Sequence, residues 1–370
     1  MLAIPHQVAD IYGTATEAVN LDVQHLVVKS VTNQFERDKM FSGRAWRVVK
    51  FGEPKEAVEL QEMTWGEPSP GQVLIRVRTA GAGFPDAMMA AGHFPLLGEP
   101  PFGLGEEAAG EIVAVQPGSR FAIGDQVAGI TEFLEGWGGY AEYAYVREGS
   151  AIRIPAGMTD EQAGGFPIGF RTAYAGLVER APVEPGQTLL ILGAAGSSGV
   201  AALQLGKALG ATVIAVAGSQ EKLEFCARYG ADHVLNYRTN DLTARITDIT
   251  DGHGADLIYD PVGGDTAASA LKSIARNGRI AMIGLASGAA LSLDSMDMLL
   301  RNYTAVGVLA TPHDDPETEA AVWDHLVSLA ENGAITTPVG TVYGFDEVPR
   351  MVAEQTAPGA GKSVVRVASE

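Results

Sequence analysis

The residues best placed to do chemistry form a glycine-rich stretch, GAAGSSG, at positions 193–199. A run of β-forming residues, 188–192, precedes it, and an apolar segment, 200–209, follows it. Such a turn lets the backbone approach a pyrophosphate at Gly196, lets a helix pack closely on a strand at Gly199, and presents free N–H groups to the phosphates. The stretch therefore predicts a dinucleotide site; the alternative is an ordinary turn of a doubly wound sheet.

The end of the next predicted strand, at Ala217, indicates which dinucleotide binds. An NAD site usually carries an acidic residue there, whereas this chain has no carboxylate to repel a 2′-phosphate. Ser219, Lys222 and Tyr237 follow, and they can supply a hydroxyl, a cation and a phenol. This set favours NADPH over NADH. Alternatively, Lys222 only solvates the start of the helix expected at 220–229.

The elements that must position these residues alternate between strand and helix. Strands are expected at 257–259, 278–284 and 305–309, with a helix at 266–274. This alternation indicates an α/β fold with a doubly wound parallel sheet. The cofactor domain is predicted to span residues 171–313.

A second predicted domain precedes and follows the first. Short alternating strands and glycine turns in residues 44–170 indicate a small, partly open β-barrel. The last segment, 314–370, is expected to return to that barrel. Residues 1–43 carry no recognisable chemistry and are predicted to be an N-terminal extension of unknown role.

Composition limits the class of protein. With 370 residues, 46% hydrophobic and 19% charged, the chain is long enough for two globular domains. A net charge of −19 disfavours nucleic acid and anionic membrane surfaces as partners. No apolar run reaches transmembrane length, and no secretory signal is evident. The single cysteine, Cys226, fits a reducing compartment, so we expect a cytoplasmic protein.

Further motifs resemble the medium-chain dehydrogenase/reductase superfamily, within it the zinc-free quinone oxidoreductase branch that includes zeta-crystallin. They are AGAGFPD at 80–86, GEEAAG at 105–110, GDQV at 124–127, GGYAEY at 138–143, TAY at 172–174, DPVGG at 260–264 and GK at 361–362. The resemblance implies a GroES-like barrel domain, a Rossmann-type domain, and NADPH-dependent hydride transfer to a quinone or another conjugated carbonyl. It also implies a homodimer that pairs through the edge strand from Ala305 to Leu309.

The positions that hold zinc in zinc-dependent relatives are occupied here by Gly83 and Glu106, and the four-cysteine lobe of those relatives is absent. Because Cys226 is the sole cysteine, we expect no zinc. Without this Lewis acid, an isolated carbonyl is not polarised. The acceptor must therefore be activated already, as a quinone or an enone is.

The resemblance places a substrate pocket beside the nicotinamide, lined by Gly83, Met88, Phe94 and Arg171. Relatives usually have Asn at Gly83 and, in some cases, a catalytic Tyr at Phe94, so this pocket is expected to be apolar and no proton donor is identified. Arg171 is the one catalytic candidate, as a ligand of an anionic substrate group or a developing enolate. The alternative is a salt bridge between Arg171 and an acid such as Glu107.

The implied cofactor contacts come from several loops. They are Thr172, Ala195, Gly196, Ser197, Ser198, Gly199, Val200, Ser219, Lys222, Tyr237, Val262, Gly284, Ala286 and Lys362, the last with a surface lysine as the alternative. Two other functions stay open beside the quinone or enone reductase. One is an enoyl-thioester double-bond reductase, which the missing Tyr at Phe94 disfavours. The other is an NADPH-binding protein without significant turnover, as in lens crystallins.

Overall fold

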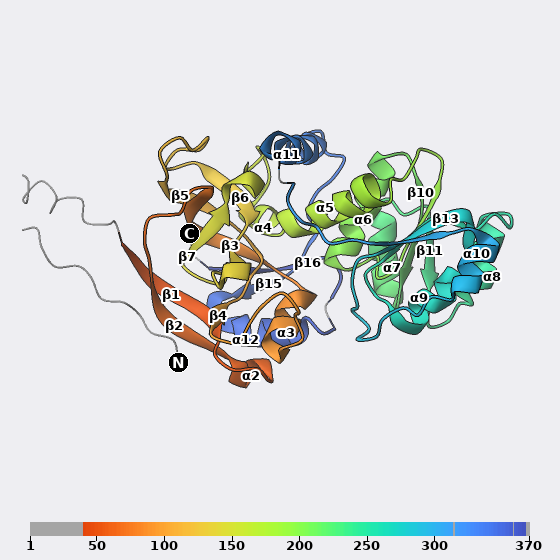
Figure 1. The fold of residues 1–370 in the computed structure, drawn as a ribbon, viewed down its shortest axis with the longest axis horizontal. Helices are drawn as coiled ribbons and strands as arrows, with labels where there is room; N and C mark the ends of the chain where they lie inside the picture. Colours follow the sequence, from red (N-terminus) through yellow and green to blue (C-terminus); the bar gives the residue numbers. More distant parts are fainter. Residues whose placement is uncertain (1–39, 314, 358, 368–370) are drawn as a thin grey trace, which may run out of the picture. The chain divides into compact units, whose positions relative to one another are not determined.

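The structure, a computed structural model, describes residues 40–313, 315–357 and 359–367 (Figure 1). Most of the predicted N-terminal extension, residues 1–39, lies outside the described residues. The first strand, β1 (Phe41–Val48), begins before the predicted end of that extension. The domain limits themselves stay a prediction.

A six-stranded parallel sheet carries the glycine-rich turn, in the order β11-β10-β9-β12-β13-β14. Its strands are β9 (Thr188–Ile191), β10 (Thr212–Ala217), β11 (His233–Asn236), β12 (Ala255–Asp260), β13 (Ile274–Met282) and β14 (Thr304–Gly307). Its helices are α6 (Ser197–Ala208), α7 (Gln220–Arg228), α8 (Leu242–Ile249), α9 (Gly264–Leu271) and α10 (Ser295–Arg301). The central strands are apolar along their length because both sheet faces are covered. Strands β10 and β11 follow on one side of β9, and β12, β13 and β14 follow on its other side. The strand order therefore reverses between β9 and β12, and ligands of such sheets bind at this point.

A second, seven-stranded sheet has the order β15-β16-β3-β5-β6-β8, with β7 paired to β3. Its strands are β3 (Gln72–Ala82), β5 (Glu107–Val115), β6 (Gln126–Ile130), β7 (Tyr143–Arg147), β8 (Ile152–Arg153), β15 (Val339–Gly344) and β16 (Lys362–Arg366). Strand β16 runs antiparallel to β3, with Ser363 opposite Ala82 (Figure 1). The last part of the chain therefore returns to the sheet formed by its first part.

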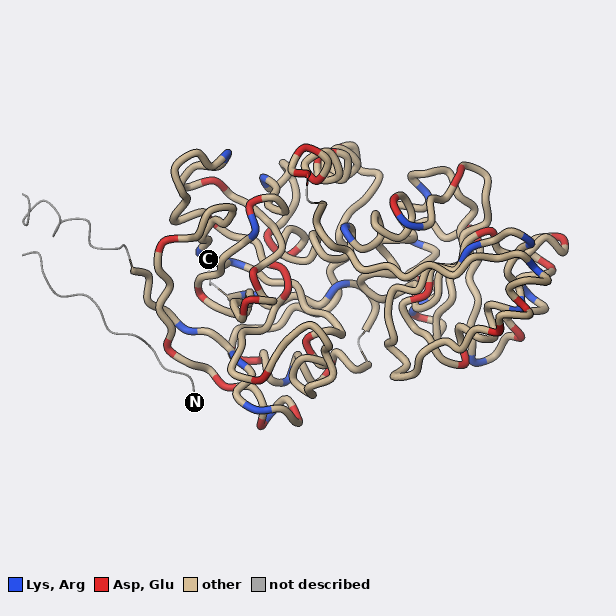
Figure 2. The backbone as a smooth tube through the Cα atoms, in the orientation of Figure 1, with Lys and Arg blue, Asp and Glu red and all other residues tan. Residues whose placement is uncertain are grey.

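A smaller sheet and several helices complete the barrel side. The sheet has the order β2-β1-β4, with β2 (Val58–Trp65) and β4 (Phe102–Gly103) on either side of β1. Helices α2 (Pro54–Ala57), α3 (Phe84–Ala91) and α12 (Val348–Glu354) contact one another in this part of the structure. Acidic and basic residues are interspersed along the described chain (Figure 2), so the net charge of −19 is not confined to one segment.

Four segments connect the two large sheets. Helices α4 (Asp160–Gly164) and α5 (Pro167–Tyr174) and a π-helical turn, η3 (Ala175–Arg180), lead to β9, and α11 (Pro316–Glu331) leads back. Helix α4 begins with a capping box, in which Thr159 and Gln162 each accept the other's backbone N–H, at 3.2 and 2.9 Å.

Several predicted boundaries are wrong; the strand expected at 305–309, for example, is β14, which ends at Gly307. The helix expected at 266–274 is α9, which ends at Leu271, and the strand expected from Gly278 begins at Ile274. The pairing of β12 with β13 shifts register between Ala255 and Leu257. From the sequence alone, the start of β13 looks like a turn because residues 275–278, which lie within the irregular part of the pairing, are ARNG.

Candidate active site

The glycine-rich turn, residues 193–199, lies between β9 and α6. Gly199 has no room for a side chain, because a Cβ there would lie 2.3 Å from the carbonyl oxygen of Gly193. At Gly196 the nearest described atom to such a Cβ is the same oxygen, at 3.4 Å, so this side of the turn is open. Gly196 is also the N-cap of α6 and provides no side chain to occupy the first N–H groups of the helix. The turn has the shape and the donors of a pyrophosphate site.

The side chain of Ser198 is hydrogen-bonded to Tyr259, a residue that the sequence analysis did not name. Its hydroxyl lies 2.6 Å from the hydroxyl of Tyr259, near the end of β12. Burial raises the pKa of Tyr259 well above its usual value, so both groups are neutral. The side chain of Ser198 is thus occupied within the protein, and its backbone N–H is the group available to an anion.

Ser219 and Tyr237 follow the ends of β10 and β11, Lys222 lies in the first turn of α7, and a second cation, Arg238, lies beside Tyr237. Ser219 Oγ accepts the backbone N–H of Lys222 at 3.4 Å and begins α7. The Tyr237 ring lies over Gly218, where a Cβ would be 2.8 Å from a ring carbon. The exposed Arg238 places its guanidinium carbon 5.6 Å from the centre of the Tyr237 ring and its Nε 3.4 Å from the hydroxyl. The signal for Arg238 was its position directly after Tyr237.

Val262, Gly284 and Ala286 lie in two adjacent loops after β12 and β13. The buried Asp260 shapes the first loop, because its Oδ1 accepts the N–H groups of Val262 and the next residue at 2.9 and 2.8 Å. The N–H of Ala286 donates at 3.1 Å to the carbonyl that precedes Val262. A Cβ on the first glycine of the turn would lie 3.0 Å from a Val262 methyl. The structure therefore brings Val262 to the glycine-rich turn, with the second loop joined to it.

Thr172 lies on α5 and is partly exposed. Helix α5 packs against the start of α6, since a Cβ on Gly169 would lie 3.5 Å from the carbonyl oxygen of Ser197. Thr172 is thus carried by the helix that lies next to the glycine-rich turn.

The seven-stranded sheet reaches the turn through the start of β16. The N–H of Gly361 donates to the carbonyl of Ala195 at 2.9 Å. Lys362 follows; it is 4% exposed and forms an ion pair with Glu107. The other oxygen of Glu107 accepts the N–H of Ile168, at the start of α5, at 2.7 Å. The surface-lysine alternative for Lys362 is therefore wrong, because its ammonium is buried against a carboxylate.

Gly83 begins α3 and is held by the buried Asp86. The Asp86 carboxylate accepts the N–H groups of Gly83 and Gly105 at 2.9 and 3.1 Å, and the Tyr140 hydroxyl donates to it at 2.7 Å. Burial nevertheless raises the pKa of Asp86 above its usual value. These three donors fix the start of α3 to the segment before β5.

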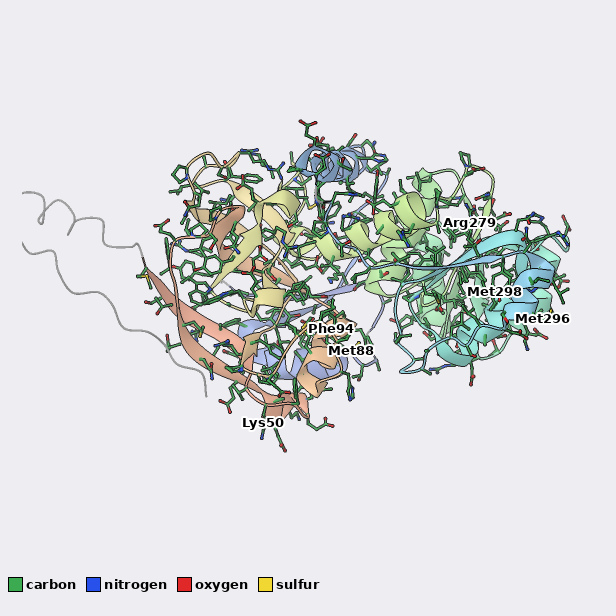
Figure 3. All side chains as sticks on the ribbon, viewed as in Figure 1. Lys50, Met88, Phe94, Arg279, Met296 and Met298 are labelled. Carbon is green, nitrogen blue, oxygen red and sulfur yellow. The ribbon has the colours of Figure 1, made fainter. Side chains whose placement is uncertain are left out.

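Met88 and Phe94 lie close together on and just after α3 (Figure 3). The N–H of His93 donates to the carbonyl of Met88 at 2.8 Å. The Phe94 ring packs edge-on against Phe133, with ring centres 6.3 Å apart. Both side chains are partly exposed, so they line an apolar surface of the barrel part.

Arg171 does not have the environment of a substrate ligand, which corrects the expectation from the sequence. Its side chain is 1% exposed and pairs with Glu179 at 3.1 Å and Glu319 at 3.3 Å. It also donates to the carbonyl of Thr311 at 3.0 Å. The salt-bridge alternative is correct in kind, but the partners are these two acids rather than Glu107.

Glu106, which the sequence analysis treated only as a missing zinc ligand, interacts electrostatically with Asp86, Glu107 and Lys362. No side chain or backbone N–H among the described residues donates to its carboxyl, and the residue as a whole is partly exposed. Burial and, next, the negative charge of Asp86 raise its pKa to about 8, against a smaller lowering by Lys362. The available signal was a charged pair, Glu106 and Glu107, within an otherwise apolar segment.

The side chains of the described residues give little support for a bound metal ion. Within residues 40–313, 315–357 and 359–367, no three His, Cys, Asp or Glu side chains are arranged to hold a metal ion. Cys226 is fully buried, and burial raises the pKa of its thiol to about 12.

In the same described ranges, no helix combines the length and the apolar character needed to cross a membrane.

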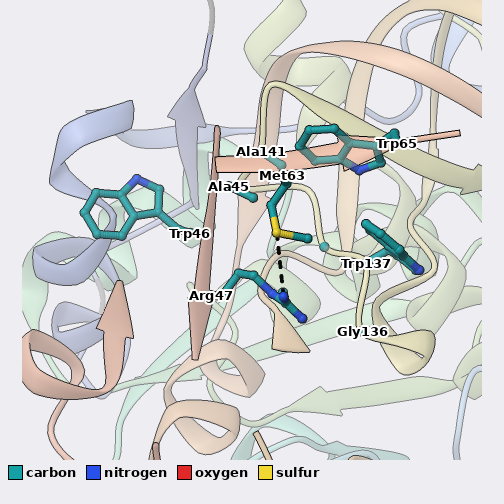
Figure 4. Close-up of a pocket in the computed structure, with 10 residues that line it drawn as sticks. Ala45, Trp46, Arg47, Met63, Trp65, Gly136, Trp137 and Ala141 are labelled. Atoms are coloured by element: carbon teal, nitrogen blue, oxygen red, sulfur yellow. Dashed lines mark hydrogen bonds between the residues drawn. The ribbon is translucent and has the colours of Figure 1, made fainter. Parts of the chain in front are cut away.

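A small cavity away from the turn holds no substrate-sized volume (Figure 4). It measures about 10 Å³, enough for one water molecule, and its lining includes Met63, Trp65 and Trp137. Arg47 Nη1 donates to the Met63 sulfur at 3.6 Å across it. We assign it no part in the site.

Comparisons with known proteins agree with this geometry. The alcohol dehydrogenase GroES-like domain model matches residues 69–156, and the zinc-binding dehydrogenase model matches residues 199–328. The chain is 32% identical over 311 residues to a quinone oxidoreductase of Pseudomonas aeruginosa, covering 83% of this chain and 94% of that one. The chain belongs to the quinone oxidoreductase branch of the medium-chain dehydrogenase/reductase superfamily.

Other members of the branch extend the similarity. A quinone oxidoreductase-like protein 2 homolog of Nematostella vectensis is 34% identical over 284 residues, or 75% of this chain and 76% of the relative. The structure of Escherichia coli quinone oxidoreductase complexed with NADPH has a TM-score of 0.80 at 26% identity, and covers 88% of this chain and 100% of that one. These findings confirm the predicted family and its fold, a Rossmann-type sheet with a GroES-like domain.

Proposed function

We propose that this protein is an NADPH-dependent oxidoreductase that transfers a hydride to a quinone or another conjugated carbonyl. The observation that carries the proposal is the open turn at Gly196, with uncapped helix N–H groups, in a chain whose relatives are quinone oxidoreductases. When bound, NADPH supplies the hydride, and the protein supplies orientation and exclusion of water.

The cofactor contacts follow from the positions of the side chains. The backbone from Ala195 to Val200 would hold the pyrophosphate. Ser219, Lys222, Tyr237 and, in addition, Arg238 would hold the 2′-phosphate, because cations and hydroxyls gather there beside a neutral strand end. We assign the nicotinamide riboside to Thr172, Val262, Gly284 and Ala286. Lys362 lies one residue from the Gly361 contact with the turn.

We propose that hydride transfer proceeds without zinc. Gly83 has no side-chain ligand atom, Glu106 belongs to no group of His, Cys, Asp or Glu side chains that could hold a metal among the described residues, and the only thiol, that of Cys226, is buried. The acceptor pocket would then consist of Gly83 and the apolar side chains of Met88 and Phe94. We do not include Arg171 in this pocket, because its guanidinium already pairs with Glu179 and Glu319.

We also propose a homodimer that pairs through β14 and α10. Strand β14 lies at the edge of the parallel sheet, and Leu309 follows it with 63% of its surface exposed. On α10, Met298 packs against the core (Figure 3), whereas Leu299 and Leu300 are 70% and 64% exposed. An apolar edge of this kind is typical of a subunit interface.

The test is NADPH consumption by the purified full chain with benzoquinones, naphthoquinones, enones and enoyl thioesters. We expect turnover with quinones or enones. Turnover with thioesters alone would favour the double-bond reductase. Tight NADPH binding without turnover on any acceptor would contradict the proposal and favour a crystallin-like binding protein.

A further inference from the structure

We propose that Glu106 is the proton donor of the reaction, delivering to the acceptor the proton that accompanies the hydride. This inference rests on the proposed function and assigns the one chemical role that the sequence analysis left without a residue.

The first argument is position. Glu106 directly precedes β5, and its carbonyl accepts the N–H of Thr131 at 2.9 Å, which fixes its backbone against the residue that follows β6. The neighbouring Glu107 binds the start of α5 and pairs with Lys362. Lys362 in turn follows Gly361, which contacts the glycine-rich turn. The Glu106 carboxyl thus belongs to the cluster through which the barrel part meets the nucleotide turn.

The second argument is the distribution of hydrogen bonds among the three carboxyls of this cluster. Asp86 accepts three, from two backbone N–H groups and Tyr140. Glu107 accepts the N–H of Ile168 and pairs with Lys362. In the described part of the chain, the Glu106 carboxyl receives none. Its carboxyl is therefore the one in this cluster left to bond with a molecule in the site.

The third argument is charge. Asp86 from α3 and Glu107 from β5 face Glu106 with negative charge, and Lys362 from β16 faces it with positive charge. Tyr140 is neutral, because burial raises its pKa well above the usual value. Desolvation and Asp86 outweigh Lys362, and the pKa of Glu106 rises to about 8. Near neutral pH the group is mostly protonated, which is the state that an acid catalyst needs.

The step balances in atoms and electrons. Hydride addition gives the acceptor two electrons and leaves an anionic oxygen, while NADPH becomes NADP⁺. The O–H bond of Glu106 breaks, its proton forms a new bond to the anionic oxygen, and the electron pair stays on the Glu106 carboxylate. The Glu106 carboxylate then takes up one proton from the bulk solvent, which is the proton that the overall reaction consumes, before the next turnover.

The test compares Glu106→Gln with the wild type on the acceptor that the wild type reduces fastest. We expect wild-type kcat to fall as pH rises through about 8, and Glu106→Gln to lose about 100-fold in kcat and this pH limb together. Glu106→Asp, which keeps the acid, should retain the limb. The matched control is Glu111→Gln on β5, the strand that Glu106 precedes; the Glu111 side chain is 39% exposed and lies 4.0 Å from Arg78, and this variant should behave as the wild type.

A second readout does not depend on turnover. The NADP⁺ complex of the wild type should show the infrared carbonyl band of a protonated carboxyl group near neutral pH, and Glu106→Gln should lack it. A wild type that turns over while Glu106→Gln keeps its rate, its pH profile and the infrared band would overturn the inference. A wild type with no turnover on any acceptor would instead overturn the proposed function, and loss of the band in Glu106→Gln would still support a protonated Glu106.

Discussion

The backbone N–H of Gly361 lies 2.9 Å from the carbonyl oxygen of Ala195 and donates a hydrogen bond to it. Ala195 belongs to the glycine-rich turn of the parallel sheet, and Gly361 directly precedes a strand of the seven-stranded sheet. The bond therefore fixes the turn that would hold the cofactor to the segment that carries Lys362, whose ion-pair partner Glu107 lies on β5. The pocket residues and the nucleotide turn are aligned by this contact and by Ile168 at the start of α5.

Two glycines of the turn should respond differently to alanine. Gly199→Ala places a Cβ 2.3 Å from the carbonyl of Gly193, so we expect a loss of about 1–3 kcal/mol in the free energy of unfolding. Gly196→Ala has space within the protein and would place its methyl where a phosphate binds. Its Tm should change little, and its NADPH affinity should fall. Thermal unfolding and calorimetric titration measure the two effects; equal behaviour of the variants would contradict the assignment.

Cofactor selectivity should depend on Lys222 and Arg238. We expect Lys222→Ala and Arg238→Ala each to raise KM for NADPH by about tenfold, because each removes a charge-assisted bond to the 2′-phosphate. KM for NADH should stay unchanged. Arg228→Ala, at the last turn of α7, is the matched control. If the two substitutions weaken both cofactors alike, these cations do not recognise the 2′-phosphate.

Arg171 should matter for stability and not for choice of substrate. Arg171→Met leaves the buried Glu319 without its guanidinium partner, so we expect the free energy of unfolding to fall by about 3–5 kcal/mol. Arg180→Met, which removes an exposed arginine one residue beyond Glu179, should have little effect. Denaturant unfolding measures this. A changed ratio of activity between anionic and neutral enones in Arg171→Met would restore the substrate-ligand hypothesis.

The raised pKa of Glu106 should make the free energy of unfolding depend on pH. A raised pKa means that the folded chain keeps a proton that the unfolded chain loses above about 4.5, so stability falls as pH rises toward about 8. Glu106→Gln lacks this titration, and its stability relative to the wild type should increase with pH across that window. Unfolding free energies measured at several pH values test this; parallel curves for the two proteins would argue against a raised pKa.

Assembly should depend on the outer face of α10. Leu300→Glu places a charge on an apolar surface that is 64% exposed in one chain, so we expect light scattering to show a monomer where the wild type is a dimer. Ile123→Glu is the control, since Ile123 is 63% exposed on the barrel side. A wild-type monomer, or a dimer unaffected by Leu300→Glu, would contradict the proposed interface.

The features that sequence reasoning identified are local in the chain. The strand, turn and helix around residues 193–199 are contiguous, so their spacing alone predicts the parallel sheet and the phosphate site. The register shift that extends β13 back to Ile274 depends on pairing with β12, and no short window of sequence contains both strands.

The features that sequence reasoning missed depend on contacts between distant residues. In the sequence, Arg171 looks like a cation near a cofactor loop, because its partner Glu319 is 148 residues further along the chain. Glu106 reads as a lost metal ligand, because the groups that perturb it, Asp86 and Lys362, are brought to it only by folding. A charged residue in an apolar motif is a signal whose meaning the tertiary structure decides.

The most direct test of the central claim is the steady-state rate of NADPH oxidation by the purified chain with a benzoquinone, compared with the same measurement for NADH. The account predicts quinone-dependent oxidation with a higher kcat/KM for NADPH than for NADH. An absence of quinone-dependent oxidation, or a preference for NADH, would contradict it.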